Sequence, residues 1–285
     1  PTQIAWLQDR CNDHQNDMIV WSRGGLPAVA AYSGTLQSLA DCYQTDPDSK
    51  FVKHGGLRHK TREHYRTLIK KIVTAHGNVR VEEIRARHVE RWYEDWSSNA
   101  KVAVGHAAIG MLRTLINFGT IYLECAECAR VSSVLHNMRF KMAKPRESFM
   151  TSEQATAIRA MAHKMGYPSI ALAQAFQFDC MFRQKDVIGE MVPISEPGVS
   201  DVINGQEKWL RGIRWEEIDE NLVLRHITSK RQKLVEIPLA SAPMVVEEIA
   251  KSGGRKASGP IIVFEGWGRP FTAHEFRRRW RKIAD

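Results

Sequence analysis

Residues 169–190 read SIALAQAFQFDCMFRQKDVIGE, an almost wholly apolar segment that changes abruptly into a charged one. The apolar part has no polar side when it is drawn as a helix, and such helices are buried on most of their surface. Charged and polar residues begin at Arg183 without a turn signal before them. We therefore expect one buried helix that carries Arg183 at its end.

Two interpretations of Arg183 are open at this point. A charged group that leaves a buried helix is costly unless another group pairs with it. Asp186 lies three residues later on the same helix face, and an ion pair between the two would satisfy both. Alternatively, the rigid helix directs the guanidinium at a phosphate, which its planar fork of donors suits. The segment alone favours the ion pair, and the rest of the chain reverses that preference.

Length and charge set the first limits on fold and partners. The chain has 285 residues, enough for two domains, and 43% of them are hydrophobic, enough for packed cores. No apolar run reaches the roughly 18 residues that a membrane-spanning helix needs, so we expect no membrane partner. The net charge of +9 favours a polyanionic partner. No signal peptide is visible, although the chain begins at Pro1 and targeting stays open.

Five cysteines are scattered along the chain, which argues against the disulfide framework of a small secreted protein. Cys125 and Cys128 have the spacing of half a zinc site, but no second pair with suitable spacing completes a tetrahedral set. Small side chains near a helix end explain this pair better than a metal does. We therefore predict no metal.

The first part of the chain predicts a small helical unit. Residues 1–34 carry only a weak helical pattern, and we interpret them as an extension. Apolar residues at helical spacing then predict a short helix over residues 35–43 and a basic helix that stops at Gly77. Two more helices are predicted over residues 81–96 and 102–123. The result is an all-helical unit of about four helices.

The basic helix has a one-sided charge. Residues 50–71 contain eight Lys or Arg residues and a single acid, Glu63. Apolar positions occupy one helix face and basic positions the opposite face. Such a face is often only solvated, but this imbalance makes it a candidate for phosphate contacts. The residues predicted to contact DNA are Arg58, Lys60, Arg62, Arg66, Lys70 and, in the polar linker 141–148, Lys144.

The second part of the chain begins with a clear helix start. Thr151 and Gln154 form a capping box. Residues 193–212 are rich in Gly, Pro, Ser and Asp and predict a long loop or insertion. Further helices are predicted over residues 242–251 and 270–285, the latter rich in arginine.

Between these helices the apolar pattern has a period of two. Strands are predicted over residues 212–219, 222–228 and 234–239, which gives a three-stranded antiparallel meander. Lys230 lies at the tip of its second hairpin. Considered alone, this residue is an ordinary solvated turn lysine.

Three segments carry a resemblance to a known family. FDCMFRQKDVIGE (178–190) is an apolar helix followed by Arg and by an acid three residues later. GIRWEEID (212–219) followed by LVLRHITSKRQKLVEIPL (222–239) is a strand and hairpin with a lysine, and KTREHYRTLIKKIVTAHGNVRVEEI (60–84) is a basic helical segment. In this order they resemble the catalytic-arginine motif, the catalytic-lysine hairpin and the start of the core-binding domain of the tyrosine recombinases, or phage integrases. The resemblance covers roughly residues 35–285.

The resemblance implies roles for three residues. Arg183 would clamp the scissile phosphate, Asp186 would brace the site, and Lys230 would be the hairpin lysine. Met181 stands where the family has a glycine. The loop that follows the arginine helix is also longer than usual for the family.

The family's C-terminal motifs have no clear counterpart. His274 and Arg277 fit its HxxR pattern, but they follow Lys230 too closely and occupy the place of a preceding amphipathic helix. All six tyrosines precede Arg183, so none matches the nucleophile. We therefore expect the sequence to be a fragment that lacks the nucleophile segment.

The resemblance also implies a fold and an activity. The expected fold class is mainly α (α+β), with an extension (1–34), a helical core-binding domain (35–144) and a mostly helical catalytic domain with a small three-stranded antiparallel sheet (149–285). The expected activity is site-specific DNA recombination through a 3′-phosphotyrosyl intermediate, which needs no metal or other cofactor. Expected partners are double-stranded DNA and, for the full-length protein, three further copies in a tetramer on DNA. Bacterial or prophage origin and a cytoplasmic, nucleoid-associated location follow from the same resemblance.

A second function is kept as the alternative. The chain could be a DNA-binding protein of recombinase fold that does not cut DNA, either a regulator or an inactive relic. The residues encoded after Asp285 discriminate between the two, because the enzyme requires an HxxR motif and a tyrosine there. A generic helical regulator would leave the strand–lysine–strand pattern unexplained.

Overall fold

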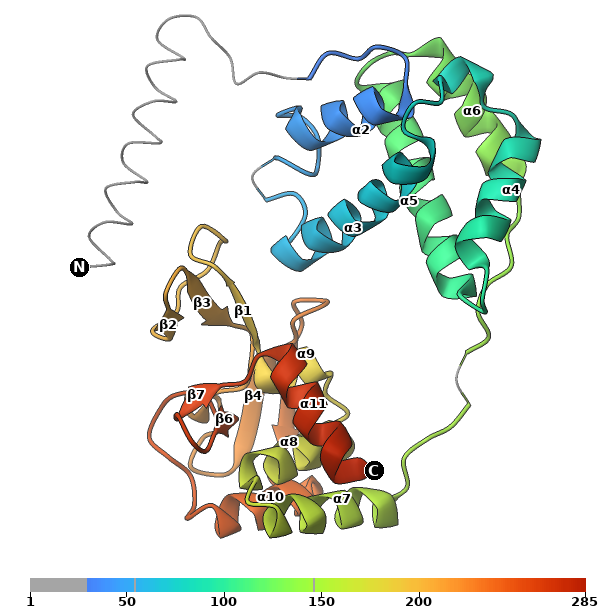
Figure 1. The fold of residues 1–285 in the computed structure, drawn as a ribbon. Helices are drawn as coiled ribbons and strands as arrows, with labels where there is room; N and C mark the ends of the chain where they lie inside the picture. Colours follow the sequence, from blue (N-terminus) through green and yellow to red (C-terminus); the bar gives the residue numbers. More distant parts are fainter. Residues whose placement is uncertain (1–29, 54, 146) are drawn as a thin grey trace, which may run out of the picture. The chain divides into compact units, whose positions relative to one another are not determined.

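The computed structural model describes residues 30–53, 55–145 and 147–285. The chain divides into two compact units, residues 1–146 and residues 147–285 (Figure 1). Most of the expected extension, residues 1–29, lies outside the described residues. Each unit has its own hydrophobic core.

The first unit is entirely helical in its described residues (Figure 1). Its helices are α2 (Leu36–Thr45), α3 (His59–His76), α4 (Ala86–Ser97), α5 (Val102–Ile121) and α6 (Ala126–Asn137), with a 3₁₀ turn at Val81–Glu83. Helix α5 contacts α2, α3, α4 and α6 and so forms the centre of the unit. Leu112, Leu115 and Ile116 on α5 are fully buried there.

Helix α5 also has the length and hydropathy of a membrane-spanning helix. Half of this stretch is buried inside the unit, however, among residues of α2, α3, α4 and α6. The core helix of a water-soluble domain has the same composition. The burial of α5 is therefore explained by its central place in the helical unit.

Helix α6 was not expected from the sequence. It begins at the cysteine pair: Cys125 is its N-cap, and the Cys125 sulfur accepts a hydrogen bond from the backbone N–H of Cys128 at 3.4 Å. Among the residues that the structure describes, no group of three or more His, Cys, Asp or Glu side chains is placed to hold a metal ion. The pair thus acts as a helix start, a task that Ser or Asp performs more often.

The second unit packs helices around α8 (Pro168–Asp179). Its other helices are α7 (Ser152–Lys164), α9 (Gln184–Ile188), α10 (Pro243–Lys251) and α11 (Ala273–Ala284). Helices α7 and α10 pack against α8, and α11 packs against α7 and α9 (Figure 1). The predicted capping box is present, since the Thr151 hydroxyl accepts from the Gln154 N–H at 3.3 Å and Gln154 accepts from the Thr151 N–H at 2.9 Å.

The apolar helix is shorter than expected. It ends at Asp179, and Arg183 lies beyond it as the N-cap of the separate helix α9. Met181 between them has φ +54°, a left-handed conformation that cannot continue a helix. Phe182 is nonetheless buried. The break turns the chain so that Phe182 enters the core while Met181 and Arg183 face outward.

The predicted three-stranded meander is wrong in its first strand. Strands β4 (Val223–Ile227) and β5 (Leu234–Pro238) pair antiparallel, with Leu224 opposite Ile237. Residues 212–219 contain a 3₁₀ helix, Trp215–Glu217, and pair with β4 as a strand at one isolated bridge, from Ile218 to Leu224. The Glu217 carboxylate accepts from the Arg214 N–H at 2.9 Å, which closes a local turn instead of a strand.

Residues 193–212 also differ from the expected loop. Part of this segment belongs to a small antiparallel sheet that begins at Glu190. Its strands are β1 (Glu190–Pro193), β2 (Ile203–Asn204) and β3 (Glu207–Leu210), in the order β1-β3-β2. The two ends of this insertion, at Gly189 and Gly212, lie very close together. If Gly212 had a Cβ atom, that atom would lie only 2.6 Å from the backbone nitrogen of Gly189. The insertion therefore leaves and rejoins the second unit at one place. A further hairpin joins β6 (Val263–Phe264) to β7 (Arg269–Pro270).

Candidate functional site

Asp186 joins the two segments that carry the predicted catalytic residues. Its carboxylate is buried, with 1% of the side chain exposed. One oxygen accepts from the backbone N–H of Ser229 at 2.5 Å, directly before Lys230. The other lies 4.0 Å from the Arg183 guanidinium. A single buried acid thus contacts Arg183 and the residue next to Lys230, although 43 residues separate Asp186 from Ser229.

Arg183 is accessible to a ligand. As the N-cap of α9 it stands at the surface, and 56% of its side chain is exposed. The 4.0 Å contact with Asp186 is longer than a hydrogen bond. Asp186 therefore lies near the guanidinium and leaves its N–H donors available to a ligand. The two interpretations of Arg183, an internal pair and an anion site, are compatible in this geometry.

Lys230 lies in the turn of the β4–β5 hairpin and is exposed. The turn is closed by a hydrogen bond from the Thr228 N–H to the Lys233 carbonyl at 2.9 Å. Its base is fixed to α9 through Ser229 and Asp186. The hairpin thus holds Lys230 in an exposed turn, and the residue before it, Ser229, is bonded to Asp186 of α9 close to Arg183.

His226, which was not among the predicted site residues, is buried beneath this site. Its Nδ1 donates to the Glu217 carboxylate, at 3.1 Å from each oxygen. Its Nε2 lies 3.9 Å from the Asp186 carboxylate and has no hydrogen-bond partner among the described residues. His226 shares the inward face of β4 with Leu224. A histidine at an inward position of a predicted strand was the available signal.

A pocket of about 270 Å³ lies beside the hairpin, with Arg211, Arg214, His226 and Gln232 in its lining. Arg214 makes a forked pair with Asp201 of the insertion, at 2.8 and 2.9 Å. Hydrogen bonds from this arginine hold the pKa of Asp201 below its usual value. Because Arg214 is paired in this way, the pocket wall is largely neutralised.

The residues predicted to contact DNA lie mostly on α3. Arg66 and Lys70 are exposed on this helix, and Lys144 is exposed after α6. The Arg66 guanidinium lies 5.2 Å from the centre of the Phe51 ring. Lys60 pairs with Glu63 at 2.8 Å.

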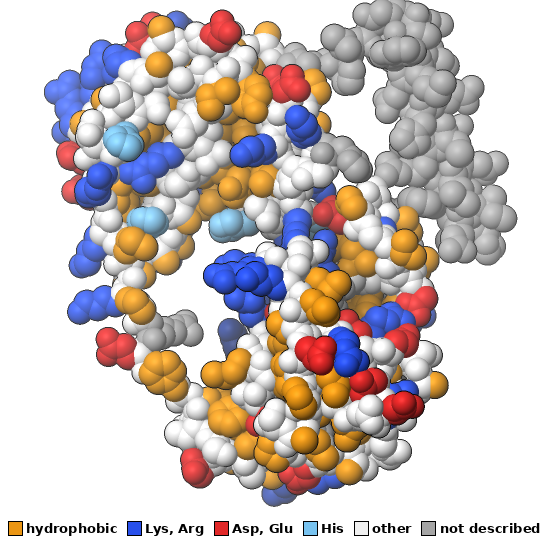
Figure 2. Space-filling model, turned by 180° about the vertical axis from the view of Figure 1, so that it is seen from behind, with side chains coloured by type: hydrophobic (Ala, Val, Ile, Leu, Met, Phe, Trp, Pro, Cys, Tyr) orange, Lys and Arg blue, Asp and Glu red, His pale blue; other side chains and the backbone are white. Residues whose placement is uncertain are grey.

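Two predicted basic residues are held by the fold at the start of α3. Arg58 is the N-cap of the helix, and Arg62 donates to the Leu57 carbonyl at 2.8 Å. In Figure 2, Lys and Arg side chains are spread over the visible surfaces of both units with Asp and Glu among them. On the face that Figure 2 shows, charge alone therefore does not locate one binding surface.

His274 and Arg277, the HxxR-like pair, are exposed on α11. Arg277 donates to the Ala273 carbonyl of its own helix at 2.9 Å. Among the described contacts, none joins either residue to Arg183, Asp186 or Lys230. Arg279, two residues after Arg277, is the arginine of this run that packs inward, with its guanidinium 4.2 Å from the centre of the Phe264 ring.

Comparisons by sequence find no relative. No protein-family profile matches the chain, and no curated protein is significantly similar to it. Similarity is found among solved structures instead.

Three such structures are integrases. A lambda integrase tetramer bound to a Holliday junction aligns with 88% of this chain, with a TM-score of 0.64 and 17% identity. A lambda integrase dimer bound to a COC′ core site aligns over the same share with a TM-score of 0.65 and 17% identity. The Tn1549 transposon integrase in complex with circular intermediate DNA gives 0.55 and 13%. This chain covers 66%, 77% and 78% of those chains, respectively.

The chain therefore has the tyrosine recombinase fold, mainly α with small antiparallel sheets. Within that class, the particular structures it resembles are the lambda and Tn1549 integrases. The expected fold class is thereby confirmed, although the strands that form its three-stranded sheet differ from those predicted.

Proposed function

We propose that this chain is part of a site-specific DNA recombinase or integrase that breaks and rejoins DNA through a 3′-phosphotyrosyl intermediate. The observation that carries the proposal is the position of Asp186 between Arg183 and the Lys230 hairpin. The similarity in fold to integrases crystallised with DNA supports it further. The chain spans 66% of the lambda integrase chain in the tetramer, so the activity belongs to the longer protein in this proposal.

Arg183 would stabilise the transition state of strand cleavage. When a tyrosine hydroxyl attacks the phosphodiester, negative charge accumulates on the non-bridging oxygens. A planar, permanently charged guanidinium that is already oriented binds this charge without further reorganisation. The Asp186 carboxylate lies 4.0 Å from the guanidinium, and the exposed side of Arg183 is open to the phosphate. Loss of one such donor raises the barrier by about 3 kcal/mol.

Lys230 would donate a proton to the leaving 5′-oxygen. This oxygen is a poor leaving group as an alkoxide, and a nearby ammonium protonates it as the bond breaks. The hairpin suits this role because the hydrogen bond from Ser229 to Asp186 fixes its position while the Lys230 side chain is exposed.

Double-stranded DNA is the proposed partner, with salt-dependent contacts from the basic residues of α3 and from Lys144. Assembly of the longer protein into a tetramer on DNA is part of the same proposal, as is a cytoplasmic, nucleoid-associated location.

The test is DNA cleavage by the full-length protein that contains this chain, on a nicked substrate that traps the covalent protein–DNA product. Arg183→Ala should lower the cleavage rate by about a hundredfold or more and leave duplex binding nearly unchanged. Arg231→Ala is the matched control, because Arg231 is an exposed arginine on the Lys230 hairpin. Equal rates for the two variants would contradict the role of Arg183.

Lys230 has its own test. Lys230→Ala should lose cleavage of ordinary DNA and regain it on a substrate whose 5′-bridging oxygen is replaced by sulfur, because a thiolate leaves without a proton donor. Lys233→Ala, on the same hairpin, should cleave both substrates at the wild-type rate.

The alternative function remains a DNA-binding protein of recombinase fold without cleavage activity. It predicts duplex binding by the full-length protein but no covalent product on the nicked substrate. A gel that separates free protein from the covalent protein–DNA product therefore distinguishes the two functions.

A further inference from the structure

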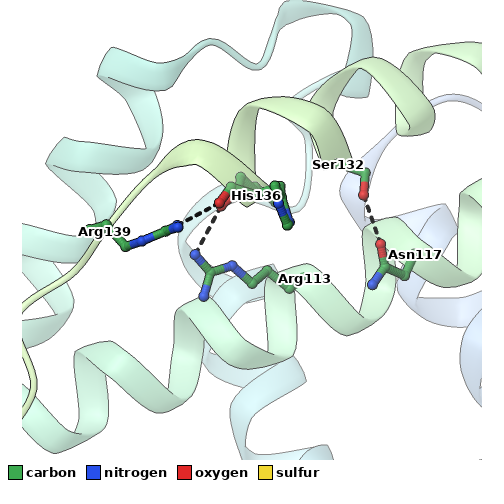
Figure 3. Close-up of a pocket in the computed structure, with 6 residues that line it drawn as sticks. Arg113, Asn117, Ser132, His136 and Arg139 are labelled. Carbon is green, nitrogen blue, oxygen red and sulfur yellow. Dashed lines mark hydrogen bonds between the residues drawn. The ribbon is translucent and has the colours of Figure 1, made fainter.

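Helices α5 and α6 form a pocket of about 370 Å³ on the first unit. Figure 3 shows its labelled residues: Arg113 and Asn117 extend from α5, Ser132 and His136 from α6, and Arg139 from the segment that follows α6. With Leu135 they complete the lining, and none of these six residues is acidic. The pocket lies outside the basic run of residues 50–71, and its lining contains none of the residues predicted to contact DNA.

The two arginines of the pocket are fixed side by side. Arg113 donates to the carbonyls of Leu135 and Met138 at 2.9 and 3.1 Å. Arg139 donates to the carbonyls of His136 and Met138 at 2.6 and 3.3 Å. Both guanidinium groups therefore share the Met138 carbonyl, and Figure 3 shows them converging on the end of α6.

This arrangement leaves several guanidinium N–H donors without an acceptor among the described residues, although the Arg113 guanidinium also lies 5.6 Å from the centre of the Phe140 ring. Two neighbouring positive charges repel each other, and the carbonyls at the C-terminal end of a helix offset only part of that repulsion. The bonds to these carbonyls involve one nitrogen of each guanidinium, whereas each group has five N–H donors. Neither arginine forms an ion pair with a carboxylate of the described residues. An anion with several oxygens would meet both the charge and the remaining donors.

We propose that this pocket binds a backbone phosphate of duplex DNA. The proposal rests on the proposed function, since it assumes that the chain binds DNA. His136, Arg139 and Asn117 are exposed, so the site is open to a polymer that continues past it on both sides. Ser132 donates to Asn117 at 2.8 Å, which fixes a second polar group at the rim. Because backbone carbonyls already hold the arginines, little side-chain freedom is lost on binding.

The two arginines lie 26 residues apart in the sequence, Arg113 within an apolar helix and Arg139 just before the polar linker, so no local pattern indicates that they meet. The packing of α6 on α5 brings them together. The site also depends on α6, the helix that the sequence analysis did not expect.

The test measures binding of this chain to a fluorescent duplex by anisotropy over a series of salt concentrations. The wild-type slope of log affinity against log salt reports the number of phosphate contacts, at about 0.9 per contact. Arg139→Gln should lower the magnitude of the slope by about 1 and weaken binding to unrelated duplexes by equal factors. Arg91→Gln is the matched control, because Arg91 is exposed on α4 of the same unit, and it should leave the slope unchanged.

Several outcomes would overturn the inference. Equal changes in slope for Arg139→Gln and Arg91→Gln would mean that the pocket has no special role. Saturable binding of inorganic phosphate to the pocket, combined with an unchanged DNA slope in Arg139→Gln, would assign the site to a free anion. If Arg139→Gln loses its helical circular dichroism signal, Arg113→Lys is measured in its place. This variant keeps the positive charge but removes the forked guanidinium donors. Unchanged DNA affinity of Arg113→Lys would contradict the proposal. Failure of the wild-type chain to bind any duplex would instead contradict the proposed function.

Discussion

Met181 combines a strained backbone with an exposed side chain. Its φ of +54° lies in the left-handed region, which costs a residue with a Cβ about 1–2 kcal/mol relative to glycine. Its side chain is 85% exposed and therefore contributes little burial to offset that cost. The position is the one where the resembled family has a glycine, so the backbone turn is present here without the residue that favours it. The turn places Phe182 in the core and Arg183 at the surface.

We expect Met181→Gly to raise the free energy of unfolding by about 1 kcal/mol, less a few tenths for the greater freedom of glycine in the unfolded chain. Urea denaturation followed by circular dichroism measures the change. Met161→Gly is the control, since Met161 is an exposed methionine in the last turn of α7, where glycine should destabilise by about 1 kcal/mol or less. A loss of stability in both variants would show that the left-handed turn at Met181 is not strained.

At the scale of elements, α7 and α10 are joined by a buried charge network. Arg159 of α7 is buried and donates to Glu248 of α10 at 2.6 Å and to Glu247 at 2.5 Å. His163 contacts the second oxygen of Glu248 at 2.5 Å. The network fixes how the two helices face each other on α8. A buried charge that loses its partner is strongly destabilising, whereas an apolar replacement of both partners is often tolerated.

Arg159→Met should therefore lower the free energy of unfolding by about 3 kcal/mol, because the Glu248 carboxylate stays buried without its main partner. The double variant Arg159→Met/Glu248→Met should recover most of this loss. Urea denaturation at neutral pH measures both variants. A single variant as stable as the double variant would contradict the account.

The same network predicts a dependence on pH. Hydrogen bonds from Arg159 and then Lys251 lower the pKa of Glu247 from 4.5 to about 2. Because the folded pKa is depressed, this stabilisation is complete above pH 4.5 and is lost as the pH falls toward 2. Glu247 is half exposed, so solvent screening reduces its share to about 1 kcal/mol or less. Glu247→Gln should flatten the acid limb of the stability curve, and an unchanged limb would contradict this.

The whole molecule consists of two separately cored units. The buried residues of the first core lie between Leu36 and Leu135, and those of the second between Ile158 and Ile283. No described residue belongs to both cores. Each core is contained in its own stretch of chain, which is the condition for independent folding of a domain.

Fragments 1–146 and 147–285 should therefore each fold alone and unfold cooperatively on heating, as followed by circular dichroism. Fragment 147–221 is the control. It contains α8 but lacks α10, which packs against α8, and it should remain without a cooperative transition. A fragment 147–285 that melts without cooperativity would show that the second core needs residues outside it.

The sequence by itself determined most of the helices, α6 excepted, and the position of the central apolar motif. Helical spacing of apolar residues predicted α3, α4, α5 and α11 because local propensity and amphipathic burial agree there. The capping box at Thr151 was predictable because it is a contact between residues three positions apart. Arg183, Asp186 and Lys230 could be named as candidates from the same segments.

Only the tertiary structure decided what those residues do to one another. The hydrogen bond from Ser229 to Asp186, the burial of His226 and the pairing of Arg113 with Arg139 at one carbonyl all join residues far apart in the chain. The strand predicted over residues 212–219 became a 3₁₀ helix, and the predicted loop before it became a sheet. The reason is that pairing partners in sheets and contacts between helices are set by packing over long separations, and a local pattern carries no record of them.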